Sequence, residues 1–260
     1  MARILTGFVL IIIGVFVLKN GQLPLFLFLS LISWLAFWEI KSFTELKSWP
    51  VFLSNIVTFQ ALFSLIYFNK LPLLFEFGYI SLIFILFTII IFEYLKKQLL
   101  FRSNQLLNNL KYFLYISLGL TSIYLIRNVE NGLLYIILLF LSIWAADVFA
   151  FYGGKLFGRH PLSKVSPNKT IEGTVIGALM AMIVVAFYCF TYQFSYVFVV
   201  VAGLIGLLGQ LGDLYESLIK RTYSIKDSSN LLPGHGGILD RADSSLFVAP
   251  IMYIIVVILS

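Results

Sequence analysis

Carboxylates and cationic side chains gather in one part of this sequence, between residues 213 and 243. The chain has five aspartates, and four of them lie in this stretch: Asp213, Asp227, Asp240 and Asp243. Basic side chains are interleaved with them, namely Lys220, Arg221, Lys226, His235 and Arg241. Carboxylates supply the oxygen ligands that hard divalent cations prefer, and lysine and arginine bind phosphate groups. The spacing therefore indicates a site that holds a divalent metal ion together with a phosphorylated ligand.

The first part of this stretch, residues 209–221, reads Gly-Gln-Leu-Gly-Asp-Leu-Tyr-Glu-Ser-Leu-Ile-Lys-Arg. In a helix, Asp213, Ser217 and Lys220 fall at i, i+4 and i+7 on one face, and Glu216 lies beside them. An aspartate at the end of an apolar span is costly unless it is paired or binds a cation, so a functional role is the default. The alternative is a simple Asp213–Lys220 ion pair that ends the helix.

The second part, residues 232–243, reads Leu-Pro-Gly-His-Gly-Gly-Ile-Leu-Asp-Arg-Ala-Asp. Proline and glycines flank His235 in a turn whose backbone amides can face an anion. Asp240 and Asp243 stand at i and i+3 and can face the same way at the start of a helix. The helix dipole favours negative charge there, so both acids could instead be N-terminal capping residues. His235 taken alone is more typical of a hydrogen-bonding turn residue than of a catalyst.

A third polar group precedes these two. Residues 153–159 read Gly-Gly-Lys-Leu-Phe-Gly-Arg, and residues 166–173 read Ser-Pro-Asn-Lys-Thr-Ile-Glu-Gly. No G-x-x-x-x-G-K-[ST] pattern can be aligned, so this is not a P-loop. Asp147, near the end of the preceding apolar run, joins the same surface. Together these segments supply the carboxylates, cations and backbone amides that binding of a magnesium nucleotide requires.

The elements that position these residues are expected to be membrane helices. The 260 residues are 60% hydrophobic and 12% charged, against about 45–50% and about 25% in soluble domains. This polar surface is too small to cover a water-soluble globule. A transmembrane helix needs about 20 apolar residues, and nine runs approach that length. They are residues 4–18, 23–38, 50–68, 73–92, 111–126, 132–152, 173–192, 194–212 and 244–260.

These long runs have no alternating polar face, which excludes a β-barrel, and no linker divides them. We expect an all-α polytopic membrane protein with about nine transmembrane helices. It forms a single domain over residues 1–260, in which 1–130 are N-terminal helices and 131–260 carry the site. The first run is expected to be a retained helix, because no small-x-small cleavage pattern follows it.

Lysine and arginine are distributed unequally between the two sides of such a bundle. Of the 18, three lie on one side, Lys19, Lys70 and Arg127, and the other fifteen lie on the opposite side. The positive-inside rule then places the N-terminus and the even-numbered loops, with the polar site, in the cytoplasm. The net charge of +6 belongs to these short loops, so we expect no nucleic-acid partner. The expected location is the cell (inner or plasma) membrane.

A long signature is assembled from these segments. It reads Ser217-x-Ile219-Lys220-Arg221-x4-Lys226-Asp227-x-Ser229-x2-Leu232-Pro233-x-His235-Gly236-Gly237-Ile238-x-Asp240-Arg241-x-Asp243. In this run the chain resembles the phosphatidate cytidylyltransferase (CDP-diglyceride synthase) family, bacterial type. The likeness extends upstream to Ser-Pro-Asn-Lys-Thr-Ile-Glu-Gly and Gly-Gln-Leu-Gly-Asp. One position departs from the family pattern: Ala242 stands where a larger apolar residue is usual.

The resemblance implies a membrane-embedded enzyme, commonly a homodimer, that joins CTP to phosphatidic acid in the membrane and releases pyrophosphate. It implies Mg²⁺ on a pair of aspartates, here Asp213 and Asp240, with Asp243 as a third ligand or a neighbour of the ligands. Whether a second metal or a monovalent ion also binds stays open. The catalytic residues expected on this basis are Asp213, Asp240, Asp243, Lys220, Arg221 and His235. The substrate-binding residues expected are Ser166, Asn168, Lys169, Lys226, Arg241 and Asp147.

Other functions compete with this interpretation. A CTP-dependent enzyme acting on another lipid, such as an ether-lipid cytidylyltransferase or a polyprenol kinase, would share the polar site. A cation-coupled transporter predicts acids scattered over several spans near mid-membrane, whereas these gather at helix ends. A CDP-alcohol phosphotransferase is disfavoured, since its D-G-x2-A-R motif is absent.

Overall fold

The computed structural model describes residues 2–44, 48–68, 74–96, 104–163, 165–232, 234 and 236–259 of the chain. Within these residues the secondary structure consists of helices, with no strands beyond two isolated bridges. The helices are α1 (Ala2–Asn20), α2 (Gln22–Phe43), α3 (Trp49–Tyr67), α4 (Leu74–Lys96), α5 (Gln105–Asn128), α6 (Gly132–Phe157), α7 (Ile171–Tyr192), α8 (Val197–Thr222) and α9 (Leu239–Leu259). The predicted all-α fold is confirmed, and nine helices correspond to the nine predicted runs.

Six of these helices are long and apolar enough to cross a membrane: α2, α3, α6, α7, α8 and α9. Within α1 and α4 the described apolar stretches are Gly7–Asn20 and Gly78–Glu93. Since a crossing helix needs about 20 apolar residues, the chain is a multi-pass membrane protein.

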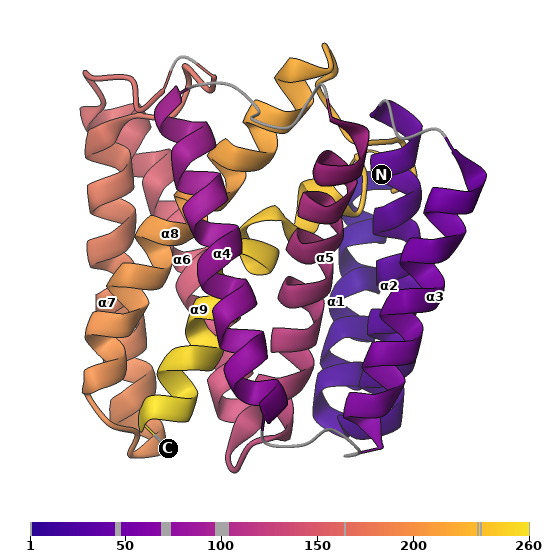
Figure 1. Ribbon diagram of the computed structural model, residues 1–260. Helices are drawn as coiled ribbons and strands as arrows, with labels where there is room; N and C mark the ends of the chain where they lie inside the picture. Colours follow the sequence, from indigo (N-terminus) through magenta and orange to yellow (C-terminus); the bar gives the residue numbers. More distant parts are fainter. Residues whose placement is uncertain are drawn as a thin grey trace.

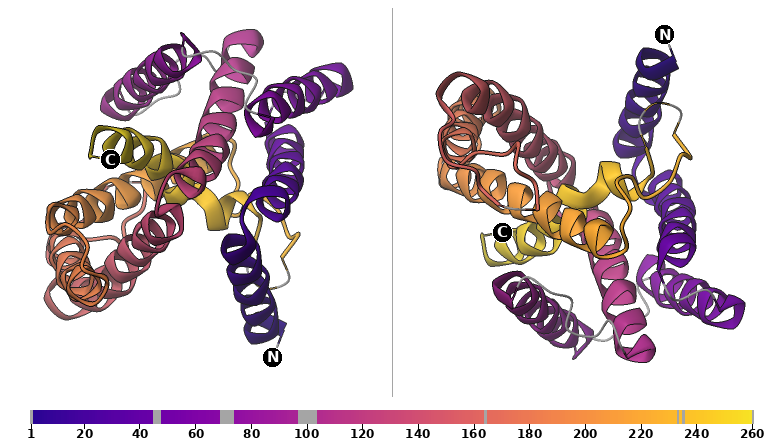
Figure 2. Two further views of the ribbon diagram at one scale, coloured as in Figure 1. Left: turned by 90° about the horizontal axis from the view of Figure 1, so that it is seen from below. Right: turned by 90° about the horizontal axis from the view of Figure 1, so that it is seen from above.

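The helices form two flanks with a pair between them (Figure 1). On one flank α1, α2 and α3 stand together, and on the other α6, α7 and α8 form a compact group; α5 and α9 run between the flanks (Figure 2). The polar loops 158–170 and 223–232 lie at one end of the bundle, opposite the turns 129–131 and 193–196 and the C-terminus (Figure 1). The alternation expected from the nine predicted runs is therefore present in these described segments.

Helices that carry polar residues extend beyond the predicted apolar runs. α8 continues to Thr222 rather than ending near residue 212, and α9 begins at Leu239 rather than near residue 244. Hydropathy detects only the apolar part of a helix, whereas the backbone hydrogen-bond ladder continues through residues that can remain hydrated or paired. The extra turns carry the acidic and basic side chains of the site.

Small residues let the helices of the α6–α8 group approach closely. A side chain at Gly177 would place its Cβ 2.5 Å from the Ala146 carbonyl oxygen, and one at Gly173 would come within 2.6 Å of the Ala150 carbonyl oxygen. Such contacts are typical of membrane helices, whose association depends on close packing because lipid tails are as apolar as leucine. This close packing fixes the positions of α6 and α7, against which α8 packs.

A buried ion pair and a tyrosine hydroxyl connect α4, α5 and α8. Lys111 on α5 contacts Glu93 on α4, with Nζ 2.9 Å from Oε1, and the Tyr215 hydroxyl on α8 donates to Glu93 Oε2 at 3.0 Å. The Lys111 and Glu93 side chains are 1% and 0% exposed. A charge buried this deeply is tolerated only when it is paired, so the pair holds α4 and α5 in register with α8.

Candidate active site

Three carboxylates meet where α8 and α9 approach each other. Asp213 and Glu216 lie one turn apart on α8, Asp243 lies on α9, and one oxygen from each falls within 4.8 Å of the others. Gly212 permits this approach, because a Cβ there would lie 2.7 Å from Cβ of Phe247 on α9. Like charges this close repel each other, so the arrangement favours a bound cation. We call Asp213, Glu216 and Asp243 the acidic cluster.

Two lysines border the acidic cluster. Lys169 Nζ lies 2.5 Å from Asp213 Oδ2, and Lys220 Nζ lies 2.6 Å from Glu216 Oε2. Among the described residues, nothing hydrogen-bonds to Oε1 of the buried Glu216. A buried acceptor without a partner is costly, and an oxygen ligand left over beside two further carboxylates suits a divalent metal ion. The donor set therefore fits the metal that the sequence led us to expect.

Asp240 has a different environment. Its Oδ1 accepts from Lys220 Nζ at 2.6 Å, while Oδ2 accepts from Gly237 N at 2.7 Å and Ser228 N at 2.9 Å. Both oxygens are thus engaged by protein groups, and among the described residues Lys220 connects Asp240 to the acidic cluster. Asp213 lies with Glu216 and Asp243, and not directly with Asp240 as expected for the metal pair. The assignment of Asp240 as a ligand stays a prediction.

The simple Asp213–Lys220 ion pair considered from the sequence is not formed. Lys220 instead bridges Glu216 and Asp240, and Asp213 pairs with Lys169 from another loop. The predicted helical face is nevertheless present, since Ser217 Oγ donates to Asp213 Oδ1 at 3.3 Å. Asp213 and Asp240 thus each pair with a lysine from another segment, which ties the 158–170 loop, α8 and α9 into one polar centre.

Glu39 on α2 belongs to this centre, and sequence reasoning missed it. Its Oε1 accepts from Ser229 Oγ at 2.6 Å and Ile238 N at 2.7 Å; its Oε2 accepts from Ser228 Oγ and Leu239 N, each at 2.9 Å. The side chain is fully buried. These bonds satisfy free amides at the start of α9, where the helix dipole favours negative charge.

A sequence signal for Glu39 did exist. It is a single acid near the end of the apolar run 23–38, and such residues are functional by default in membrane helices. Its partners lie 189 to 200 positions further along the chain, so no local pattern could have identified them.

The 158–170 loop holds Lys169 at the site. The Thr170 hydroxyl caps α7 by accepting from Gly173 N at 3.1 Å, and Leu162 N donates to the Lys169 carbonyl at 2.7 Å. Glu172 accepts from the His160 backbone N at 3.2 Å and lies 2.6 Å from His160 Nδ1. With both ends of the loop anchored in this way, Lys169 is directed toward α8.

Two further predicted residues of this region occupy different positions. The Lys169 backbone N donates to the Ser166 carbonyl at 3.1 Å, which closes a turn between these residues. Asn168, within this turn, is exposed. On α6, Asp147 accepts from Gln210 Nε2 on α8 at 2.6 Å. Asp147 thus contacts α8 at Gln210, one turn before Asp213.

The remaining predicted site residues lie around this centre. Arg221, Lys226 and Arg241 are exposed, and Arg221 Nη1 donates to the Ile225 carbonyl at 3.1 Å. Cationic side chains at the rim can bind phosphate groups. His235 lies outside the described residues.

A multi-pass helical bundle with carboxylates, lysines and a capped loop at the ends of its helices defines a membrane-embedded protein with a polar site whose carboxylates could hold a metal ion. The chain belongs to the cytidylyltransferase family, whose sequence model matches residues 1–259.

Several relatives carry the same name. The chain is 35% identical to a phosphatidate cytidylyltransferase of Staphylococcus saprophyticus over 98% of each chain. It is 32% identical to the phosphatidate cytidylyltransferase of Bacillus subtilis over 99% of this chain and 98% of that protein. A phosphatidate cytidylyltransferase of Synechocystis is 47% identical over 136 residues, which is 51% of this chain and 46% of that protein.

Proposed function

We propose that this protein is a phosphatidate cytidylyltransferase, which transfers CMP from CTP to phosphatidic acid and gives CDP-diacylglycerol and pyrophosphate. The observation that carries the proposal is the acidic cluster bordered by Lys169 and Lys220 at the ends of membrane helices. Such a place can receive a water-soluble nucleotide from one side and a lipid from the other. Membership of the family and two relatives of matching length support the same activity.

In the reaction, a phosphate oxygen of phosphatidic acid attacks the α-phosphorus of CTP. The new P–O bond forms as the bond from the α-phosphorus to the bridging oxygen breaks, and pyrophosphate leaves with that electron pair. A phosphate monoester is already ionised near neutral pH, so no general base is required. The residues must bring two anionic groups together and orient them, and positioning supplies a large part of the rate.

The charge balance of the polar centre explains how anions are accommodated. Six carboxylates, from Glu39, Asp147, Asp213, Glu216, Asp240 and Asp243, lie in this centre together with two lysines, Lys169 and Lys220. Asp213, Glu216 and Asp243 would hold Mg²⁺, which when bound neutralises charge on the reacting phosphates. With Asp213 and Glu216 holding a cation, Lys169 would be available to phosphate oxygens, whereas Lys220 would keep Asp240 as a partner and could offer its remaining N–H groups.

The other assignments complete the proposal. Arg221, Lys226 and Arg241 bind phosphates at the rim, and Ser166 and Asn168 contact the nucleotide beside Lys169. The polar end of the bundle faces the cytoplasm of a cell membrane, in agreement with the positive-inside rule. The active protein is a homodimer, as the resemblance implies.

The test is an assay of purified protein in detergent with dioleoyl phosphatidic acid, radiolabelled CTP and Mg²⁺. We expect label to move into a lipid product, and EDTA to stop this transfer. Folded protein that makes no labelled lipid would refute the proposal. Replacing phosphatidic acid by a polyprenol or an ether-lipid phosphate tests the related enzymes, because preferential labelling of either acceptor would reassign the substrate.

Variants assign the metal ligands. Asp243→Asn should raise the Mg²⁺ concentration for half-maximal activity by at least tenfold, because a metal-binding oxygen is lost. Asp240→Asn tests the assignment of Asp240 as a ligand: a similar rise in Mg²⁺ requirement would support it, whereas a lower thermal stability with an unchanged Mg²⁺ requirement would assign Asp240 to the contacts with Lys220, Ser228 and Gly237. The matched control is Glu130→Gln, an exposed acid at the other end of the bundle. Equal Mg²⁺ requirements for Asp243→Asn and the control would remove Asp243 from the metal site.

Lys169→Ala tests the nucleotide contact. Loss of the lysine side chain should raise the KM for CTP by about tenfold or more, which corresponds to the free energy of one charge-assisted hydrogen bond. An unchanged KM for CTP would exclude Lys169 from the nucleotide site.

A further inference from the structure

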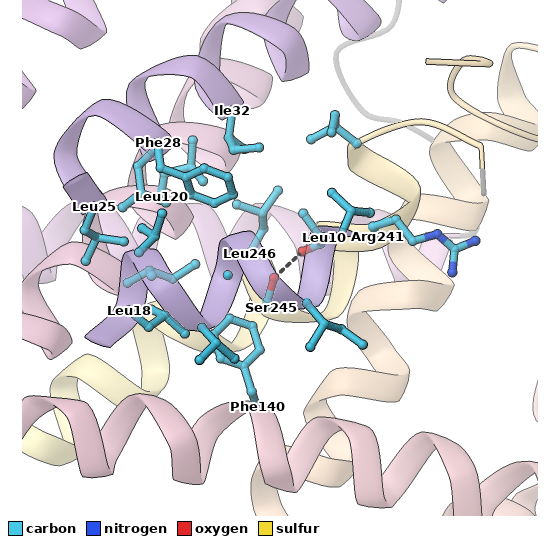
Figure 3. A pocket seen from close by; sticks show the side chains of 18 of the residues that line it. Leu10, Leu18, Leu25, Phe28, Ile32, Leu120, Phe140, Arg241, Ser245 and Leu246 are labelled. Carbon is cyan, nitrogen blue, oxygen red and sulfur yellow. Dashed lines mark hydrogen bonds between the residues drawn. The ribbon is translucent and has the colours of Figure 1, made fainter. Parts of the chain in front are cut away.

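An apolar cavity of about 310 Å³ lies behind the first turns of α9, between α1 and α2 on one side and α5 and α6 on the other (Figure 3). Leucine, isoleucine, valine and phenylalanine make up most of its lining. Among the described lining residues, Arg241 is the one charged side chain, and the hydroxyl of Ser245 is satisfied by donating to the Ala242 carbonyl at 2.9 Å. The cavity is therefore suited to a hydrocarbon chain with an anionic group at one end.

The position of the cavity connects it with the polar centre. On α9, Asp240 contacts Lys220 and Asp243 belongs to the acidic cluster. Arg241 and Ala242 of the same helix line the cavity. In Figure 3 the aliphatic part of Arg241 lies against the apolar side chains and its guanidinium points away from them. Arg241 thus marks the boundary between hydrocarbon and the acids on the same helix, as long cationic side chains commonly do.

A lipid chain can reach this cavity from the bilayer. Ile11 and Val15 both line it and are also exposed on α1, where they are 58% and 60% exposed. Burying a chain among apolar side chains gains little over leaving it among lipid tails. Selection of one lipid must therefore come from shape and from the charge at Arg241, and an anionic phosphate head group matches that charge.

The dimensions also suit one chain. The lining residues of α1 run from Leu10 to Leu18, and eight residues of helix rise about 12 Å. One leaflet of the hydrocarbon core is about 15 Å thick. Ala242 also lines the cavity, and its small side chain leaves room beside Arg241.

We propose that this cavity holds one acyl chain of the lipid substrate, with the lipid phosphate at Arg241 beside the acidic cluster. This inference rests on the proposed function, since the occupant is the phosphatidic acid that reacts. The N-terminal helices α1 and α2 then act as the part of the enzyme that selects the acyl chain.

Gly14 provides a direct test. It lines the cavity, and a Cβ there would meet nothing within 4 Å, so Gly14→Leu introduces a bulky side chain at the cavity wall from a position with open space around its Cβ. The matched control is Gly78→Leu on α4, which also has open space around its Cβ and lies outside the cavity. Each variant is assayed in detergent with dioleoyl and with dihexanoyl phosphatidic acid, the second having chains too short to fill the cavity.

We expect Gly14→Leu to lower the ratio of kcat/KM for dioleoyl over dihexanoyl phosphatidic acid by about tenfold, within the range that overpacking produces. Gly78→Leu should leave the ratio unchanged. An unchanged ratio in Gly14→Leu, or an equal fall with both lipids, would overturn the chain site while leaving the wild-type activity established. If the wild type converts neither lipid, the proposed function itself fails.

A second measurement distinguishes the substrate from bulk lipid. Wild-type protein is photolabelled in vesicles with phosphatidic acid or with phosphatidylcholine, each carrying a diazirine at the chain end. Labelling of residues 10–18 by the phosphatidic acid probe, competed by unlabelled phosphatidic acid, supports the proposal. Equal labelling by both probes would show that the cavity holds bilayer lipid of any class.

Discussion

Glu39→Gln removes one charge from the bond network that links α2 to the start of α9. The carboxylate accepts from two backbone amides, of Ile238 and Leu239, one on each oxygen. A glutamine side chain has a single acceptor oxygen, so whichever way its amide is turned, its NH₂ group faces one of these N–H groups. Serine hydroxyls can rotate to adapt, whereas backbone amides cannot.

The cost can be worked from these contacts. An orphaned buried donor costs about 1–3 kcal/mol, and the bonds that remain weaken because they lose a charged acceptor. Loss of negative charge at a helix N-terminus adds about 0.3–1 kcal/mol. We therefore expect local opening of residues 228–239 to become easier by about 3 kcal/mol, which is a factor of about one hundred.

Amide hydrogen exchange read by mass spectrometry measures this opening. In Glu39→Gln, peptides that cover residues 228–239 should exchange about a hundredfold faster, with peptides of α6 and α7 unchanged, and transfer activity should fall at least tenfold. The matched control, Glu130→Gln, makes the same chemical change at an exposed position. Wild-type exchange rates in residues 228–239 of the Glu39 variant would refute the reasoning.

Two further predictions concern helix packing. Gly212→Ala should destabilise the protein by about 1–3 kcal/mol through overpacking against Phe247 and lower activity, whereas Gly209→Ala, with its nearest atom at 3.7 Å, should behave like wild type in thermal unfolding and transfer assays. Lys111→Met should lower the free energy of unfolding by about 3–5 kcal/mol because Glu93 is left charged and buried, and adding Glu93→Gln should restore most of it. If Lys111→Met were as stable as the double variant with Glu93→Gln, the Lys111–Glu93 ion pair would not be needed to hold a charged Glu93 in the core.

Much of the fold followed from composition. Runs of apolar residues predicted nine helices, since hydrocarbon requires every backbone group to be bonded within its own segment. Helix ends were predicted less well, because α8 continues ten residues past its apolar run.

The candidate site was predictable where its residues are close in sequence. Asp213 and Ser217 share the face that helical spacing required. Pairs between distant segments, such as Lys169 with Asp213, were not predictable, because long-range pairing depends on how helices pack rather than on local pattern. For the same reason Lys220 could not be assigned to Asp240 and Glu216 in advance.

The long separation between Glu39 and its partners has a consequence for biogenesis. Leu239, the last of them, is synthesised 200 residues after Glu39, which at about 5–20 residues per second takes about 10–40 s. Throughout that interval α2 presents a carboxylate whose permanent donors do not yet exist. The nascent chain must therefore keep this acid hydrated, protonated or in contact with an insertion factor. The polar centre is complete only when α9 has been synthesised, because Asp240, Asp243 and the donors to Glu39 lie at its start.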